Sequence, residues 1–308
     1  NFYIITNYSN LIMFGLFSRE QEHKIDGREV SIYRDSRGNF KQLMKYILLV
    51  CETERVARYF PRIEFLIVDF QKKGLGDQSI ALVLTKHLKK GKAVVYLDIS
   101  NQNRDFKEIK STIIHELTHI WHEQVSKMSS TSAKIHKRLS KVIANDVSKE
   151  LKDTRMMLQV FIDKIHYEGI AEFAAKIPSG LEYSKKEFVV NYLMAKDSAK
   201  EFNKLWAIFL KTTKINLKRD YQVLSKKFEG NKIPYIIGLH MTHTIKYVFV
   251  DVTFQEIAKF SRFKFLKKYE EAMSHGDLKP ILTRESNEGI IDYNRILGDL
   301  TDLYHKNL

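Results

Sequence analysis

The segment with the clearest chemical potential is His115-Glu116-Leu117-Thr118-His119, which matches the pattern HExxH. On a helix, His115 and His119 lie one turn apart on the same face, so both imidazoles can reach one metal ion. Neutral imidazole nitrogen is among the ligands that zinc prefers, and tetrahedral coordination leaves further positions for other groups. We therefore expect these two histidines to bind one Zn2+ ion.

The residues around the motif predict an amphipathic helix over roughly 104–127. At about 100° per residue, its apolar side chains fall within about 120° of one another and form a core stripe. That stripe contains Ile113, Ile114, Leu117, Ile120 and Trp121. The histidines of the motif lie on the opposite side, where His122 joins them.

Two further residues of this helix need a role. Glu116 is offset from both ligands, about 60° from His119, which places its carboxylate near a water molecule on the ion. That is the position of a general base. His122 is not expected to be a ligand, because one straight helix does not readily wrap three imidazoles around an ion. A role in supporting a ligand, or a surface position, is favoured for it.

A second helix, over residues 153–176, offers the missing ligand. Glu168 and Glu172 lie one turn apart on a side that also carries Phe161, Ile165, Ala171 and Ala175. A buried ionised carboxylate is costly without a partner, and a metal cation and a histidine N–H would be such partners. We expect Glu168 to be the third ligand and Glu172 to be the acceptor that orients one histidine. The reverse assignment, and an exposed pair of glutamates, stay open.

The rest of the chain predicts an α+β fold. Four short β-branched runs read as strands, namely Glu29–Tyr33, Ile63–Phe70, Ser79–Leu84 and Ala93–Ile99. Helical spacing is found over 39–59 and then over roughly 104–127, 131–150, 153–176, 186–212, 214–228, 234–250, 254–273 and 290–306.

We expect two lobes that together form one catalytic module. The N-terminal lobe, residues 1–127, holds a small mixed sheet and the HExxH helix. The helical C-terminal lobe, residues 128–308, supplies the third metal ligand. Gly169 and Ala171 are small enough to let their helix pack closely on the HExxH helix.

HELTH followed downstream by EGIAEF resembles the gluzincin zinc metallopeptidases, which include the thermolysin-like enzymes. In that family two histidines of HExxH and a glutamate from a later helix bind zinc, and an acidic residue four positions further corresponds to Glu172. The resemblance covers only residues 111–123 and 165–175, and the interval between them is longer than in thermolysin itself. The family also places an edge strand beside the cleft, a role in which we expect Ala93–Ile99.

The segment after Pro234 resembles one that some gluzincins place over the cleft. Peptide hydrolysis builds negative charge on the carbonyl oxygen, and a tyrosine hydroxyl or histidine N–H aimed there stabilises it. Tyr235 is the first candidate for this donor, and His240 and then His243 are the alternatives. The resemblance implies a substrate that is a peptide or protein, whose extended backbone pairs with Ala93–Ile99.

Composition bounds the other classes of function. The chain has 308 residues, 44% of them hydrophobic, and a formal net charge of +14. Lysine predominates and no nucleic-acid-binding motif accompanies it, so a solvated basic surface is favoured over specific nucleic-acid binding. Cys51, the single cysteine, is expected to be a buried hydrophobe. No apolar run is long enough to span a bilayer.

We accordingly expect a soluble zinc metallopeptidase, with the cytoplasm favoured, and the start at Asn1 rather than Met leads us to expect that the original N-terminus is missing. Two rival functions stay open: a zinc-binding regulator that does not cut, and a basic protein that docks on nucleic acid. Cleavage preference, exo- or endopeptidase action and oligomeric state do not follow from the sequence.

Overall fold

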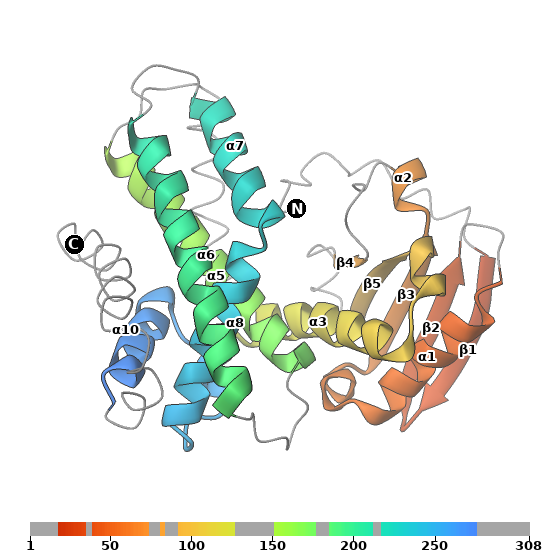
Figure 1. Ribbon diagram of the computed structural model, residues 1–308. Coiled ribbons are helices and arrows are strands. Elements are labelled where there is room, and N and C mark those ends of the chain that lie inside the picture. Colours follow the sequence, from red (N-terminus) through yellow and green to blue (C-terminus); the bar gives the residue numbers. More distant parts are fainter. Residues whose placement is uncertain are drawn as a thin grey trace. The chain divides into compact units, whose positions relative to one another are not determined.

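A computed structural model describes residues 18–34, 39–73, 81–83, 92–126, 151–176, 185–211 and 217–275 of the chain. Within these ranges the fold is α+β, as predicted, with a five-stranded mixed sheet followed by helices (Figure 1). The chain divides into two compact units: unit 1 is Asn1–Gln124 with Ala174–Lys176, and unit 2 is Val125–Phe173 with Ile177–Leu308. The boundary expected after residue 127 lies outside the described residues.

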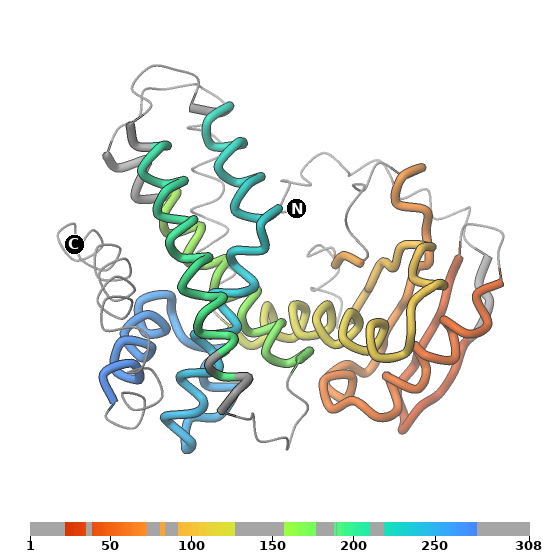
Figure 2. Tube along the Cα trace, in the orientation of Figure 1, coloured from red at the N-terminus to blue at the C-terminus, as the bar shows by residue number. Residues whose placement is uncertain are grey.

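The sheet of unit 1 has the strand order β1-β2-β3-β5-β4. Its strands are β1 Ser18–Ile25, β2 Arg28–Arg34, β3 Arg62–Val68, β4 Ala81–Val83 and β5 Lys92–Asp98. β2, β3 and β5 run parallel, whereas β1 and β4 pair antiparallel at the two edges. Parallel neighbours need a crossover connection, and helix α1, Lys41–Thr53, supplies it between β2 and β3 (Figure 2).

β1 is a strand that the sequence pattern does not predict, because most of its residues are polar or charged. It forms as one arm of a hairpin whose turn is Asp26-Gly27. Both turn residues have positive φ, 48° and 77°, the backbone that a two-residue hairpin loop requires and that Asp-Gly favours. β2 then pairs with β1 from Arg28 opposite Ile25 to Arg34 opposite Ser18.

The prediction that Ala93–Ile99 forms an edge strand is wrong. Among the described residues, β5 lies between β3 and β4, and Ala81–Val83 pair with Val95–Leu97. The backbone groups of this part of β5 already belong to a ladder on both sides, so an extended peptide cannot pair with them there. An edge position depends on which strand pairs beyond it, and a strand's own sequence does not indicate that.

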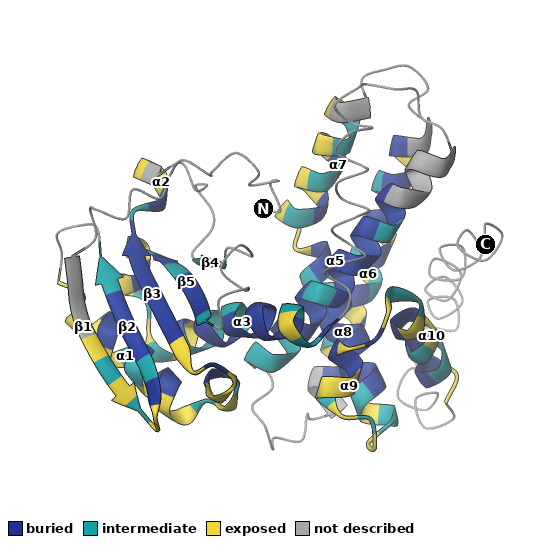
Figure 3. Cartoon of the chain, turned by 180° about the vertical axis from the view of Figure 1, so that it is seen from behind, coloured by how far each residue is buried: buried dark blue, intermediate teal, exposed yellow. Residues whose placement is uncertain are grey.

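Helices α1 and α3, Phe106–Val125, lie along one face of the sheet (Figures 1 and 3). Alternate strand residues on a single face have exposed fractions of 1% or less, as expected under a helical layer; they are Val30, Ile32, Ile63, Phe65, Ile67, Val95 and Leu97. Cys51 of α1 is a buried hydrophobe, as its sequence context predicts. Burial raises the pKa of its thiol to about 12, so it does not act as a nucleophile at neutral pH.

Unit 2 is helical. Its described helices are most of α5, Leu151–Lys176, then α6 Lys185–Lys211, α7 Leu217–Gly230, α8 Ile233–Val248, α9 Phe254–Ala258 and α10 Arg262–Met273. α8 packs against α6, α7 and α10, and every residue from Ile237 to Ile245 is buried. Phe161 of α5 lies 5.7 Å from Phe202 of α6 and 4.7 Å from Phe228 of α7, measured between ring centroids. These rings form an aromatic cluster that joins three helices.

The prediction of one helix over 254–273 is wrong, because two capped helices occupy that range. Thr253 and Glu256 form a capping box at the start of α9. The Ser261 Oγ accepts a hydrogen bond from the Lys264 N–H and begins α10 anew. The helices expected over 131–150 and 290–306 lie outside the described residues. No helix in the described ranges combines the length and hydropathy that crossing a membrane requires.

Candidate metal centre

α3 carries the HExxH segment and begins at a capped end. The Asp105 Oδ1 accepts a hydrogen bond from the Glu108 N–H at 2.8 Å, and the Asp105 carbonyl accepts one from Ile109. The predicted core stripe is confirmed, since all of its members have exposed fractions of 5% or less: Ile113, Ile114, Leu117, Ile120 and Trp121. This stripe anchors α3 in the core of unit 1, and the motif histidines project from another side of the helix.

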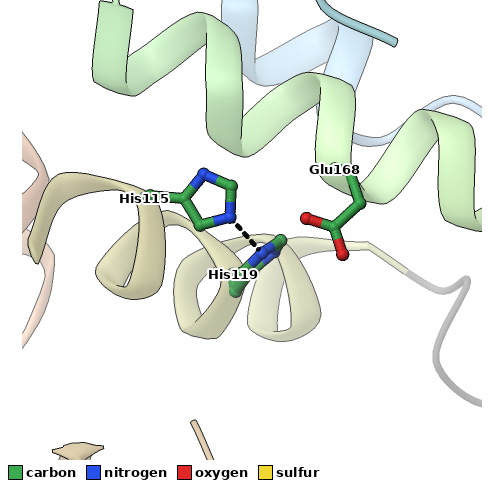
Figure 4. Close-up of side chains that lie close together, drawn as sticks. All are labelled: His115, His119 and Glu168. Carbon is green, nitrogen blue, oxygen red and sulfur yellow. Dashed lines mark hydrogen bonds between the residues drawn. The ribbon is translucent and has the colours of Figure 1, made fainter. Parts of the chain in front are cut away.

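The two motif histidines turn ring nitrogens toward one another. The Nε2 atoms of His115 and His119 are 2.9 Å apart, and the rings are perpendicular, with centroids separated by 4.5 Å (Figure 4). Two nitrogen lone pairs at this distance repel unless one nitrogen carries a proton or a cation lies between them. Two nitrogens bound to a tetrahedral zinc, each about 2.0–2.1 Å from it, lie about 3.3 Å apart. A small change in the ring angles would therefore admit the ion.

Glu168 of α5 completes a group of three potential ligands. One ligand atom from each of His115, His119 and Glu168 lies within 4.8 Å of the other two, and Figure 4 shows the carboxylate directed toward the rings. Glu168 has an exposed fraction of 4% and His119 of 7%, whereas His115 is half-buried. The three residues could hold a metal ion, and the described part of the chain contains no second group of this kind.

The chemistry of the donor set fits such an ion. A carboxylate as deeply buried as Glu168 is stabilised in its ionised form by a cation, and imidazole nitrogen with carboxylate oxygen is a common ligand combination for zinc. The limit of 4.8 Å between ligand atoms exceeds the separation of about 3.3 Å expected around a bound zinc. Rotation of the Glu168 side chain can close that difference.

Glu116 and Glu172 lie close in sequence to members of the group. Glu116 on α3 and Glu172 on α5 are both half-buried, and neither belongs to the group of potential ligands. Their roles, general base and acceptor of a histidine N–H, stay predictions. His122 has an exposed fraction of 0%, so the surface position considered for it is wrong.

Tyr235 is half-buried in the first turn of α8. The helix begins at Ile233, directly after Lys232, which adopts the left-handed conformation with φ 55°. Pro234 follows in the first turn, where its missing N–H needs no helical acceptor. The role of Tyr235 as an oxyanion donor stays a prediction.

His240 and His243 lie in the interior of unit 2, with exposed fractions of 0% and 4%. The His240 ring is surrounded by aromatic rings, with centroid distances of 5.6 Å to Phe188, 5.5 Å to Tyr192 and 5.8 Å to Tyr269. Burial, with a smaller effect of the His243 charge, lowers the pKa of His240 to about 3. The ring is therefore neutral at neutral pH. This enclosure favours a packing role and leaves Tyr235 as the better candidate donor.

Two buried ion pairs fix α5 about one turn before Glu168. The sequence analysis predicted neither of them. The Arg262 guanidinium of α10 donates two hydrogen bonds of 2.7 Å to the Asp163 carboxylate, and Lys164 pairs with Glu229 of α7. The sequence does contain a signal for them. Residues 157–165 are apolar except for Gln159 and the adjacent Asp163 and Lys164. Buried charges in such a stretch require partners.

His166 links α5 to α9 and α10. Its Nε2 lies 3.0 Å from the Ile257 carbonyl oxygen, and its ring stacks on Phe265 at a centroid distance of 4.1 Å. Burial lowers the pKa of His166 to about 4. The neutral ring then donates its Nε2–H to the carbonyl.

Gly169 makes its closest contact within unit 2, and the expected packing of its helix on the HExxH helix stays a prediction. A Cβ placed on Gly169 would lie 2.3 Å from the carbonyl carbon of Gly238 on α8. The missing side chain thus permits a close approach to α8. Sequence offers a signal only in retrospect, since Gly238 is the single glycine inside α8.

Comparison of the chain with protein-family models, with curated proteins and with solved structures gave no match.

Proposed function

We propose that the chain is a zinc-dependent metallopeptidase of the gluzincin type. The observation that carries this proposal is the group of His115, His119 and Glu168, whose ligand atoms lie within 4.8 Å of one another. A three-ligand set leaves one coordination position open, which is the usual arrangement of catalytic zinc, whereas structural zinc is closed by four protein ligands.

Zinc is the ion that suits these donors. Two imidazoles disfavour the hard cations calcium and magnesium, which prefer oxygen ligands, and the group contains no sulfur that would select copper(I). Zinc bound there would lower the pKa of a coordinated water and polarise the scissile carbonyl.

Glu116 supplies the base in this proposal. A carboxylate beside the ion, but not on it, accepts the proton of the attacking water and delivers it to the leaving amine nitrogen. Glu116 thereby returns to its ionised form. Its backbone follows His115 directly on α3, so the buried stripe of that helix positions both the base and a ligand.

Tyr235 and Glu172 complete the chemistry. The Tyr235 hydroxyl donates a hydrogen bond to the carbonyl oxygen as negative charge develops there. Glu172 accepts a hydrogen bond from the N–H of a metal-binding histidine, which fixes the tautomer and makes the other nitrogen a better ligand. Amide hydrolysis needs both a stabilised oxyanion and a protonated leaving group, which these residues would supply. The resemblance to the gluzincins makes a peptide or protein the expected substrate.

The test compares the native chain with Glu116→Gln and with a matched control, Glu108→Gln, an exposed glutamate on the same helix. Zinc content is measured for all three, and cleavage is measured by digesting a broad peptide library. All three should contain zinc. Native chain and Glu108→Gln should cleave peptides, while Glu116→Gln should lose at least about 10²–10⁴-fold in rate.

Other outcomes would contradict the proposal in distinguishable ways. Zinc in every protein with cleavage in none indicates a zinc-binding regulator. Salt-sensitive binding of nucleic acid that survives His115→Ala, without cleavage, indicates a nucleic-acid-binding protein. Equal cleavage by the native chain and Glu116→Gln removes the general base from the mechanism.

A further inference from the structure

The backbones of α5 and α8 touch at a pair of glycines inside unit 2. A Cβ on Gly169 would lie 2.3–2.5 Å from the C, O and Cα atoms of Gly238. A Cβ on Gly238 would lie 2.1 Å from the Ile165 carbonyl oxygen and 2.6–2.7 Å from the Cα and N atoms of Gly169. Real Cβ atoms essentially never come within 3.0 Å of a heavy atom. Because backbone atoms cannot rotate away, neither position accepts alanine unless a helix moves.

This crossing lies beside two residues of the proposed site. Gly169 directly follows Glu168 on α5, and Tyr235 precedes Gly238 by about one turn of α8. A helix rises about 1.5 Å per residue, so contact at the glycines restricts both side chains from a short distance. A displacement of about 1 Å in a ligand or a donor is enough to lower activity strongly.

We propose that the Gly169–Gly238 crossing is a positioning contact, which fixes the position of the Glu168 carboxylate relative to the Tyr235 hydroxyl. This inference rests on the proposed function. The crossing adds to an aromatic cluster and two ion pairs that also hold this helix.

Because of those other contacts, neither helix can move at the crossing without disturbing the rest of unit 2. Asp163 is fixed by the bidentate Arg262 contact of 2.7 Å, and Lys164 is fixed by Glu229, each close to Glu168 along α5. α8 is buried on all sides from Ile237 to Ile245. An added methyl group at the crossing must therefore shift α5 against its ion pairs or shift α8 with Tyr235. Either shift changes the position of Glu168 relative to Tyr235.

The experiment uses Gly238→Ala with two controls in the full chain. Gly230→Ala is the matched glycine control, because nothing lies within 4 Å of a Cβ placed there. Phe228→Leu is the stability control, because it weakens the aromatic cluster without touching the crossing. Zinc Kd is measured by competition with a chromophoric chelator, kcat and KM are measured on one cleaved peptide, and circular dichroism confirms folding.

Gly238→Ala should raise the zinc Kd at least tenfold and lower kcat by more than it changes KM. Gly230→Ala and Phe228→Leu should keep the zinc Kd within twofold of the native value. An unchanged zinc Kd and kcat in folded Gly238→Ala would overturn the positioning role alone. A native chain that binds no zinc would overturn the proposed function, and this inference with it.

Should Gly238→Ala fail to fold, hydrogen exchange of the native chain decides the question. Amides of α8 around Gly238 should exchange more slowly when zinc is added, although α8 contributes no ligand. Slowing confined to α3 and α5, the helices that carry the ligands, would overturn the proposal. α1, which contributes no residue to the proposed ligand group or to the crossing, serves as the internal reference.

Discussion

The Nε2 atoms of His115 and His119 lie 2.9 Å apart on one side of α3. Helix geometry brings the two side chains near each other, but it does not require their ring nitrogens to meet. A single proton can satisfy this contact, and so can a shared cation. A cation would also be held by the neighbouring carboxylate of Glu168, whose exposed fraction is 4%.

Loss of either histidine should abolish tight metal binding. His115→Ala and His119→Ala are each expected to weaken zinc binding by at least about 100-fold, more than the loss of a residue that only orients a ligand. Isothermal titration of the zinc-free chain measures this. His275→Ala, an exposed histidine, is the control and should bind as the native chain does. Native affinity in either motif variant would remove that histidine from the site.

Tyr235→Phe should impair turnover and leave zinc content intact. Removing one hydrogen-bond donor to an oxyanion typically lowers kcat by about 10²–10³-fold, while KM should change little because the contact strengthens in the transition state. Steady-state kinetics on a single peptide tests this. Tyr247→Phe, which alters an exposed tyrosine of the same helix, should match the native chain. If Tyr235→Phe is equally active, the oxyanion is stabilised elsewhere.

Breaking the Asp163–Arg262 pair should destabilise unit 2. The two side chains are 6% and 11% exposed, and removing one partner of a buried pair costs about 3–5 kcal/mol of unfolding free energy. Arg262→Ala is therefore expected to lower the urea midpoint clearly. Glu271→Ala, which removes the more exposed Lys268–Glu271 pair of the same helix and leaves Lys268 over the Phe249 ring, should cost less than about 1 kcal/mol. Equal effects of the two variants would show that burial does not strengthen the first pair.

His240 should make the chain less stable in acid. Its pKa in the folded chain is about 3, against 6.5 for an ordinary histidine, so below pH 6.5 the unfolded chain binds a proton that the folded chain does not. Stability is therefore retained above that pH and falls toward pH 3, by about 1.4 kcal/mol per pH unit. The titratable side chains described beside His240 are His243 on α8, Tyr192 on α6 and Tyr269 on α10.

The comparison of His240→Asn with the native chain isolates this effect. Urea unfolding at several values between pH 7 and pH 4.5 should show a shallower loss of stability in the variant. His275→Asn, at an exposed position, should follow the native slope. Parallel slopes for all three chains would mean that other groups cause the acid sensitivity.

Features with a strong local period could be predicted from the sequence. The core stripe of α3, from Ile113 to Trp121, follows helical spacing over several turns, and the structure buries each of its members. The three potential ligands were also predictable, because HExxH fixes two of them and Glu168 is a carboxylate on an apolar helix face. Both arguments need only the residues of one helix at a time.

Features that depend on a partner could not be predicted in the same way. β1 is polar and exists because β2 pairs with it through the Asp26-Gly27 turn. β5 is interior because β4 covers it. Gly169 faces Gly238, which lies on a helix far along the chain. For β5 and Gly169 the neighbouring residues in sequence carry no information about the deciding contact, whereas for β1 the local signal is the Asp-Gly turn that follows it.

The central claim is that His115, His119 and Glu168 bind one zinc ion, and a zinc titration of the metal-free native chain beside Glu168→Gln tests it most directly. The native chain should bind one ion per chain, and Glu168→Gln, which keeps the shape of the side chain but removes its charge, should bind at least tenfold more weakly. A native chain that takes up no zinc, or a Glu168→Gln chain that binds it equally well, would contradict the claim.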